Sequence, residues 1–210
     1  PGPVTLELGG KNPQPILRDA DLDIAIPGVI DGMRYTRQGQ ACTAGSRVYI
    51  QEKIYEKVLG GVVDKLKNLK MGNALDENSD IGAIISKEQL DRTLHYMNIA
   101  KDNSSTKVLH GGNQKKEGDY KEGFFYEPTL LSGVPVESPV CQEEIFGPVA
   151  CAIPFKSFDE VLKSANNTPF GLSAVLWTQN LSRALQFVEE IEAGFVQVNQ
   201  CVAPRANVSY

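Results

Sequence analysis

One cysteine, Cys42, stands in a stretch of small residues whose composition suits covalent chemistry. Residues 38–47 read QGQACTAGSR, so a single thiol is surrounded by alanine, threonine and glycine. The stretch separates a pattern of helical spacing from an apolar run at 48–50 that is typical of a strand. A substrate can reach a thiol at such a junction, and the thiolate is the nucleophilic form of cysteine. Cys42 is therefore a candidate nucleophile.

This cysteine needs an activating neighbour, because a free cysteine is only a few per cent thiolate at neutral pH. The only two histidines, His95 and His110, are distant in sequence and give no local sign of a Cys/His pairing. A lone cysteine among small residues is also commonly a buried apolar side chain. Both interpretations of Cys42 stay open on its local setting alone.

Glu7 is the second candidate for chemistry. Residues 4–8 alternate between apolar and polar side chains, which predicts a strand, and Gly9 and Gly10 then end it. Glu7 would lie near the carboxyl end of that strand, the edge at which open α/β sheets bind ligands. The alternative is a solvent-facing carboxylate on an edge strand.

The rest of the chain predicts the helices and strands that would position these groups. Residues 19–23, DADLD, predict an N-cap and an acidic first turn for a helix that runs to Met33. Pro27 predicts a kink or break in it, because proline inside a helix costs about 3 kcal/mol. Extended segments are predicted over residues 13–17, 47–51, 106–110, 124–131, 149–155, 173–177 and 195–199, and further helices over 54–69, 86–101, 157–166 and 181–192.

Strands that alternate with helices of about ten residues predict βαβ units. The predicted fold class is therefore α/β, a mostly parallel sheet with helices on both faces.

Composition narrows the class of protein. With 41% hydrophobic and 22% charged residues the chain is typical of a soluble globular protein. A net charge of −5 without a basic stripe argues against nucleic acid as a partner. No apolar run approaches the roughly 18 residues of a membrane span, so no membrane partner is expected, and no metal site is predicted.

The four cysteines, at 42, 141, 151 and 201, show no tight spacing in a chain that is large enough to fold without disulfides. We expect thiols in a reducing compartment and a cytoplasmic location. The first residues, PGP, lack a signal-peptide pattern and an initiating methionine. They suggest a processed chain or a piece of a longer one.

Seven short motifs occur along the chain in one order. They are LELGGK at 6–11, DADLD at 19–23, GQAC at 39–42, FYEPT at 125–129, EEIFGPV at 143–149, ANNTPFGL at 165–172 and GFVQVN at 194–199. With these motifs the chain resembles the aldehyde dehydrogenase superfamily over nearly its whole length, in the portion that forms the catalytic domain.

The resemblance implies a role for five residues. Cys42 matches the family's nucleophile, and Glu7 matches the carboxylate that activates water for deacylation. Glu144 matches the residue that hydrogen-bonds the nicotinamide ribose, Phe146 matches a ring beside the nicotinamide, and Leu8 stands where the backbone approaches it. The implied cofactor is NAD or NADP.

The implied reaction oxidises a small-molecule aldehyde to a carboxylic acid. A Cys42 thiohemiacetal forms first and a thioester follows, with the backbone N–H of Cys42 helping to hold the oxyanion. The resemblance makes residues 1–210 the catalytic domain and places the nucleotide-binding domain and a C-terminal tail outside this chain. We therefore expect the chain by itself to be inactive as a dehydrogenase, and the parent enzyme to be a homo-oligomer.

Two alternatives from other classes stay open. A cofactor-independent thiol esterase or acyl-transfer domain would use the same Cys42 and Glu7. A non-enzymatic α/β domain that serves folding or assembly would leave Cys42 unreactive.

Overall fold

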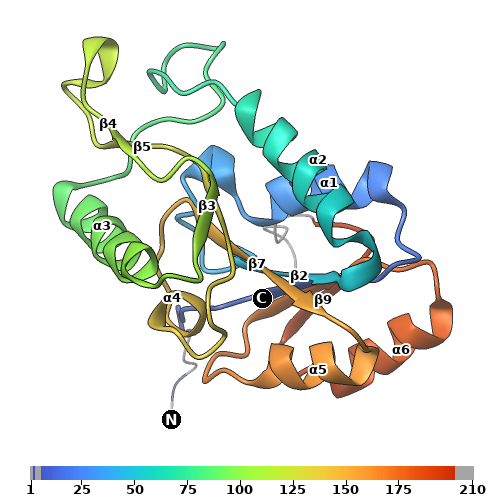
Figure 1. Ribbon diagram of the computed structural model, residues 1–210. Coiled ribbons are helices and arrows are strands. Elements are labelled where there is room, and N and C mark those ends of the chain that lie inside the picture. Colours follow the sequence, from blue (N-terminus) through green and yellow to red (C-terminus); the bar gives the residue numbers. More distant parts are fainter. Residues whose placement is uncertain (1, 3–5, 202–210) are drawn as a thin grey trace.

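A sheet of five strands is the centre of the computed structural model, which describes residue 2 and residues 6–201 (Figure 1). In spatial order the strands are β1 (Pro13–Ile16), β2 (Arg47–Gln51), β7 (Val149–Phe155), β6 (Thr129–Ser132) and β3 (Lys107–His110). The first four are parallel, whereas β3 runs antiparallel to β6. The predicted α/β fold with a mostly parallel sheet is confirmed.

A second parallel pair of strands lies beside β1. β8 (Ser173–Leu176) pairs with β9 (Phe195–Val198). A bridge between Ile16 and Trp177, together with backbone hydrogen bonds from Leu17 N to Trp177 O (3.0 Å) and from Trp177 N to Pro15 O (2.9 Å), joins β8 to β1. Beyond β1, β8 and β9 thus extend the sheet with two more parallel strands.

Helices cover both faces of the sheet, as Figure 1 shows for α1 and α2 on one side and α5 on the other. The helices are α1 (Leu22–Gly32), α2 (Tyr55–Lys67), α3 (Lys87–Asp102), α4 (Pro139–Gln142), α5 (Phe158–Asn166) and α6 (Leu181–Glu190). Short 3₁₀ turns occupy η1 (Tyr35–Arg37), η2 (Glu52–Ile54) and η3 (Gly118–Tyr120), and β4 (Gln114–Lys115) pairs with β5 (Phe125–Tyr126) in a small hairpin.

The two faces carry separate cores because successive strand side chains point to opposite sides. In β2, Val48 and Ile50 belong to the core that includes α1 and α2, whereas Tyr49 belongs to the core that includes residues of α3, α4, α5 and α6. In β7, Ala152 belongs to the first core and Cys151 to the second. No helix within the described residues is long and apolar enough to cross a membrane.

Two local expectations are wrong. The strand predicted over residues 4–8 does not form over 6–8, where Leu6 and Leu8 are 69% and 61% exposed; Val4 and Thr5 lie outside the described residues. The first strand is β1 instead, because only there does the chain meet a neighbouring strand. Of the kink or break expected at Pro27, the break is wrong: α1 continues through this residue. Val29 beyond it is buried against the sheet, and packing offsets the cost of the proline.

Candidate functional site

Three loops meet at the amino-terminal ends of β1, β2 and β7. Residues 6–12 lead into β1, residues 38–46 into β2 and residues 143–148 into β7. Because these strands are adjacent and parallel, the loops that precede them lie at one edge of the sheet. All five predicted site residues lie in these loops.

Glu7 lies at the other edge of the sheet from the one that the sequence predicts. We expected Glu7 near the carboxyl end of a strand, but it precedes β1 and is exposed. The error follows from the misplaced first strand: once β1 starts at Pro13, every residue of the Glu7 segment lies on its amino-terminal side.

A tight turn presents Cys42. The Ala44 N–H donates to the Ala41 carbonyl (3.0 Å), which closes a turn around the half-buried Cys42. Gly39 ahead of it has φ of 65°, and a Cβ at this position would lie 2.2 Å from the Gly147 carbonyl oxygen. Glycine is therefore needed here, both for the left-handed backbone and for the close approach of the Cys42 and Glu144 loops.

Asn12 fixes this turn from the neighbouring loop. Its Nδ2 donates to the carbonyl oxygens of Cys42 (2.7 Å) and Ala44 (2.9 Å), and its Oδ1 accepts from the Ser173 N–H (3.0 Å). The side chain is only 3% exposed, so these three hydrogen bonds are shielded from solvent. Sequence analysis did not single out Asn12, because a polar residue between a lysine and a proline carries no local sign of burial.

A pair of glycines brings the Glu7 segment against both other loops. The Gly10 N–H donates to Glu144 Oε1 (2.9 Å), and a Cβ on Gly10 would lie 2.4 Å from the Cys42 carbonyl oxygen. A Cβ on Gly9 would lie 2.7 Å from Glu144 Oε2. The Gly-Gly step thus lets one backbone segment touch the thiol loop and the carboxylate loop together.

Helix α3 holds the third loop in place. Gln89 Nε2 donates to the carbonyl oxygens of Ile145 (3.0 Å) and Phe146 (2.8 Å), and Arg92 donates to the carbonyl oxygen of Glu144. Phe146 has φ of 57°, a left-handed conformation that side chains rarely adopt and that packing must maintain. Gln89 and Arg92 were missed in the sequence, where polar residues on a helix indicate no more than a solvated face.

The other sequence candidates lie differently. Leu8 is exposed, and it stands with Glu7 on the segment immediately ahead of Gly9. His95 lies on α3 and His110 on β3, outside the three loops. Burial lowers the pKa of His110, with a smaller opposing effect from Glu127.

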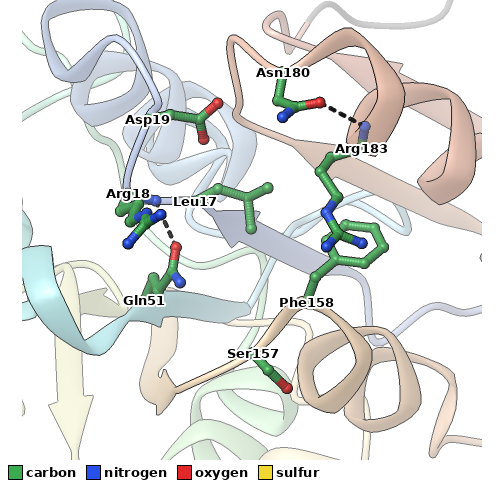
Figure 2. Close-up of a pocket in the computed structure, with 8 residues that line it drawn as sticks. All are labelled: Leu17, Arg18, Asp19, Gln51, Ser157, Phe158, Asn180 and Arg183. Carbon is green, nitrogen blue, oxygen red and sulfur yellow. Dashed lines mark hydrogen bonds between the residues drawn. The ribbon is translucent and has the colours of Figure 1, made fainter.

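A pocket of about 440 Å³ lies at the opposite, carboxyl edge of the sheet (Figure 2). It is lined by Leu17, Arg18, Asp19, Gln51, Ser157, Phe158, Asn180 and Arg183. Two of its three charged side chains are engaged by the protein: the Asp19 carboxylate accepts from the Thr178 hydroxyl (2.9 Å), and the Arg183 guanidinium stacks over Phe158 at 4.7 Å. None of these eight described residues is a cysteine, so the candidate site is the amino-terminal edge.

Comparison with known proteins finds relatives that match almost the whole chain. The profile of the aldehyde dehydrogenase family matches residues 2–210. An alpha-ketoglutaric semialdehyde dehydrogenase of Bacillus subtilis (strain 168) is 41% identical over 194 residues, which are 92% of this chain and 39% of the relative.

Solved structures show the same similarity. An aldehyde dehydrogenase from Bacillus cereus in its NAD+ complex superposes with a TM-score of 0.90 and 39% identity, over 95% of this chain and 40% of that one. A betaine aldehyde dehydrogenase from Staphylococcus aureus in complex with NAD+ gives a TM-score of 0.92 and 32% identity, over 96% of this chain and 40% of that one. The chain spans about two fifths of the length of these relatives. By the family match over almost all of its residues, the chain belongs to the aldehyde dehydrogenase family.

Proposed function

We propose that residues 1–210 are the catalytic domain of an NAD(P)-dependent aldehyde dehydrogenase, with Cys42 as nucleophile and Glu7 as the base for deacylation. The observation that carries this proposal is the meeting of three loops: Gly10 touches the Cys42 carbonyl oxygen and donates to the Glu144 carboxylate. A thiol, a carboxylate-bearing segment and a second carboxylate are thereby joined at one edge of the sheet.

The chemistry assigned to the chain's own residues has two stages. The Cys42 thiolate attacks the aldehyde carbon, and the backbone N–H of Cys42 helps to hold the oxyanion of the thiohemiacetal. A bound nicotinamide would supply the hydride acceptor, and loss of hydride from this carbon would leave a thioester on Cys42. Glu7 then removes a proton from water as the water attacks the thioester, and the Cys42 thiolate leaves.

The residues of the third loop fit the nicotinamide end of the cofactor. Gly10, Ala41, Glu144 and Phe146 surround a cavity of only about 10 Å³ beside the Cys42 turn, so we place the nicotinamide against the surface of these loops and not inside this cavity. Glu144 gives one carboxylate oxygen to Gly10, and its second oxygen is a suitable acceptor for ribose hydroxyls. Phe146 offers a flat apolar ring, and the backbone near Leu8 completes this end.

The phosphate and adenosine contacts belong, in this proposal, to a nucleotide-binding domain outside the chain, because the sequence has no Gly-rich phosphate-binding turn. We infer that the 210-residue chain alone does not oxidise aldehydes. The substrate is a small aldehyde, the class to which the semialdehyde and betaine aldehyde in the relatives' names belong. For the parent enzyme we propose a homo-oligomer in the cytoplasm.

Cys42→Ser in the complete enzyme tests the proposal, with Cys201→Ser as the matched control. A serine hydroxyl is scarcely ionised at neutral pH, so aldehyde oxidation should fall to below about a hundredth of the wild-type rate, a loss above roughly 2.7 kcal/mol. The control should keep the wild-type rate. A Cys42→Ser enzyme that retains more than that hundredth would remove Cys42 as the nucleophile.

A further inference from the structure

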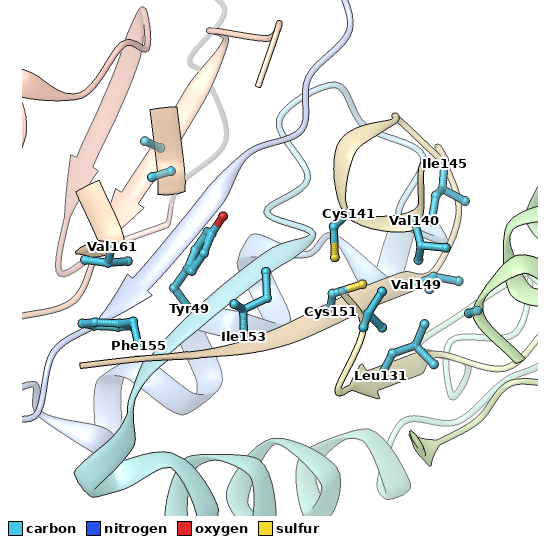
Figure 3. Packing of buried hydrophobic residues seen from close by; sticks show 14 of the residues in the cluster. Tyr49, Leu131, Val140, Cys141, Ile145, Val149, Cys151, Ile153, Phe155 and Val161 are labelled. Carbon is cyan, nitrogen blue, oxygen red and sulfur yellow. The ribbon is translucent and has the colours of Figure 1, made fainter. Parts of the chain in front are cut away.

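Two buried cysteines form a second thiol site, separate from Cys42. Cys141 on α4 and Cys151 on β7 are 0% and 1% exposed, and neither forms a disulfide. Figure 3 shows both side chains extending into the space between α4 and β7, with their sulfur atoms next to each other. The proposed reaction at Cys42 uses neither thiol.

Two basic side chains are buried with these thiols, and burial lowers the pKa of both Lys11 and Arg47. Strand register pairs Arg47 of β2 with Cys151 of β7, so their side chains share one face of the sheet. Lys11 is 2% exposed, and its carbonyl oxygen accepts from Arg47 Nε (2.8 Å). The Arg47 guanidinium also donates to the Ala165 carbonyl oxygen (2.8 Å). Within the described part of the chain, neither Lys11 nor Arg47 forms an ion pair with a carboxylate.

These surroundings shift the pKa values of the two thiols in opposite directions. A hydrogen bond with the Cys151 side chain lowers the pKa of Cys141, and Lys11 and Arg47 lower it further against the effect of burial. The same hydrogen bond, with burial, raises the pKa of Cys151 well above its usual value. Of the two neighbouring thiols, Cys141 therefore ionises more readily and Cys151 keeps its proton.

We propose that Cys141 and Cys151 are a redox modification site, in which a small peroxide converts the dithiol to a disulfide that alters the position of Glu144. The Cys141 thiolate attacks one peroxide oxygen, the O–O bond breaks, and hydroxide leaves and takes up a proton to give water. The product is a sulfenic acid on Cys141. The Cys151 sulfur then attacks the Cys141 sulfur and loses its proton, and the sulfenic hydroxyl leaves as water. The two thiols lose two electrons, and hydrogen peroxide is reduced to two molecules of water; an alkyl hydroperoxide would give one water and one alcohol.

The disulfide would act on the candidate site through the short chain between them. Hydrogen-bonded sulfur atoms are farther apart than the roughly 2.05 Å of a disulfide bond, so its formation draws α4 toward β7. Glu144 lies three residues after Cys141, and its carboxylate accepts the Gly10 N–H at 2.9 Å. Displacement of α4 therefore strains the hydrogen bond that joins the Glu144 loop to the Gly10 segment.

Peptide mass spectrometry of the 210-residue chain tests the covalent step. The reduced chain is treated with hydrogen peroxide, unfolded in an alkylating agent and digested. With cleavage after Glu143 or Glu144, which lie between the two cysteines, we expect a cross-linked pair of peptides that contains Cys141 and Cys151 and has lost two hydrogens, whereas Cys201 stays alkylated. In Cys151→Ser a dimedone adduct should mark a sulfenic acid on Cys141, and in Cys141→Ser no adduct should mark Cys151.

Three results would overturn the proposal. In the first, peroxide oxidises Cys42 or Cys201 while Cys141 and Cys151 both remain free to be alkylated. In the second, Cys141 of the wild-type chain is oxidised to a sulfinic acid and forms no cross-link. Both come from the wild-type chain, so they do not depend on how the variants fold.

The third result concerns Glu144 and is measured by hydrogen exchange. The Gly10 amide should exchange with deuterium about fivefold faster in the oxidised chain, the equivalent of one net hydrogen bond. Equal exchange in both forms would contradict the coupling. None of these measurements requires aldehyde oxidation, so they are independent of the role proposed for Cys42.

Discussion

Asn12→Asp is the substitution that most directly tests how the thiol turn is held. The side chain keeps its shape, but both donors on Nδ2 are replaced by a carboxylate oxygen. That oxygen would face the carbonyl oxygens of Cys42 and Ala44, which lie 2.7 and 2.9 Å from Nδ2. The hydrogen bond from the Ser173 N–H to Oδ1 is compatible with either residue.

The expected loss of stability follows from these contacts. Two net hydrogen bonds of about 1 kcal/mol each disappear, and an acceptor buried without a donor adds about 1–3 kcal/mol. The total is about 3–5 kcal/mol, since the side chain is 3% exposed and solvent screens little of it. For a chain of this length, a loss of about 4 kcal/mol lowers the melting temperature by roughly 8–16 °C.

Urea unfolding at pH 7 measures this loss, with the fluorescence of the sole tryptophan, Trp177, as the probe. Asn98→Asp, an exposed position on α3, is the matched control and should stay within about 0.5 kcal/mol of wild type. The rate of Cys42 alkylation in the native state gives a second readout, and it should rise in Asn12→Asp because the turn is released. If the two variants unfold within 1 kcal/mol of each other, as a rough limit, and alkylate equally, Asn12 does not position Cys42.

Three further predictions concern the candidate site and the core. In the complete enzyme, Glu7→Gln should slow deacylation more than hydride transfer, which gives a burst of reduced cofactor before a slow steady state; if both phases fall together, Glu7 acts before the thioester forms. The 210-residue chain should melt cooperatively but release no heat in a calorimetric titration with NAD, because Glu144 and Phe146 hold only the nicotinamide end. A dissociation constant below about 10 μM, or roughly −6.8 kcal/mol, would place the dinucleotide site within these residues. Burial raises the pKa of Tyr35 and of Tyr126, so above about pH 10 the unfolded chain holds fewer protons than the folded chain and stability should fall as pH rises. Absorbance at alkaline pH should then show these two phenols ionising only with unfolding, and ionisation of all seven tyrosines before the fluorescence transition would contradict their burial.

Local patterns in the sequence were sufficient for most of the elements. The cap predicted at residues 19–23 is found, with Asp21 as the N-cap of α1. The helix predicted from residue 86 is also found, with Ser86 as the N-cap of α3. The strand at 47–51 and the order of strands and helices after residue 149 also agree with the structure. These features depend on neighbours within a few residues, which is the range that periodicity and capping report.

The sequence by itself also determined which residues are candidates for chemistry, because small-residue loops, a lone thiol and ordered motifs are visible in one dimension. It could not decide which loops meet. That depends on the order β1, β2, β7 in the sheet, which joins Gly10 to Glu144 across 134 positions and Asn12 to Cys42 across 30. The same tertiary order decided that the first strand is β1 and not residues 4–8, since a strand needs a partner as well as an alternating pattern. It also placed Cys141 against Cys151 and buried Lys11 and Arg47 beside them, because burial follows from how strands and helices pack and not from the residues on either side in the chain.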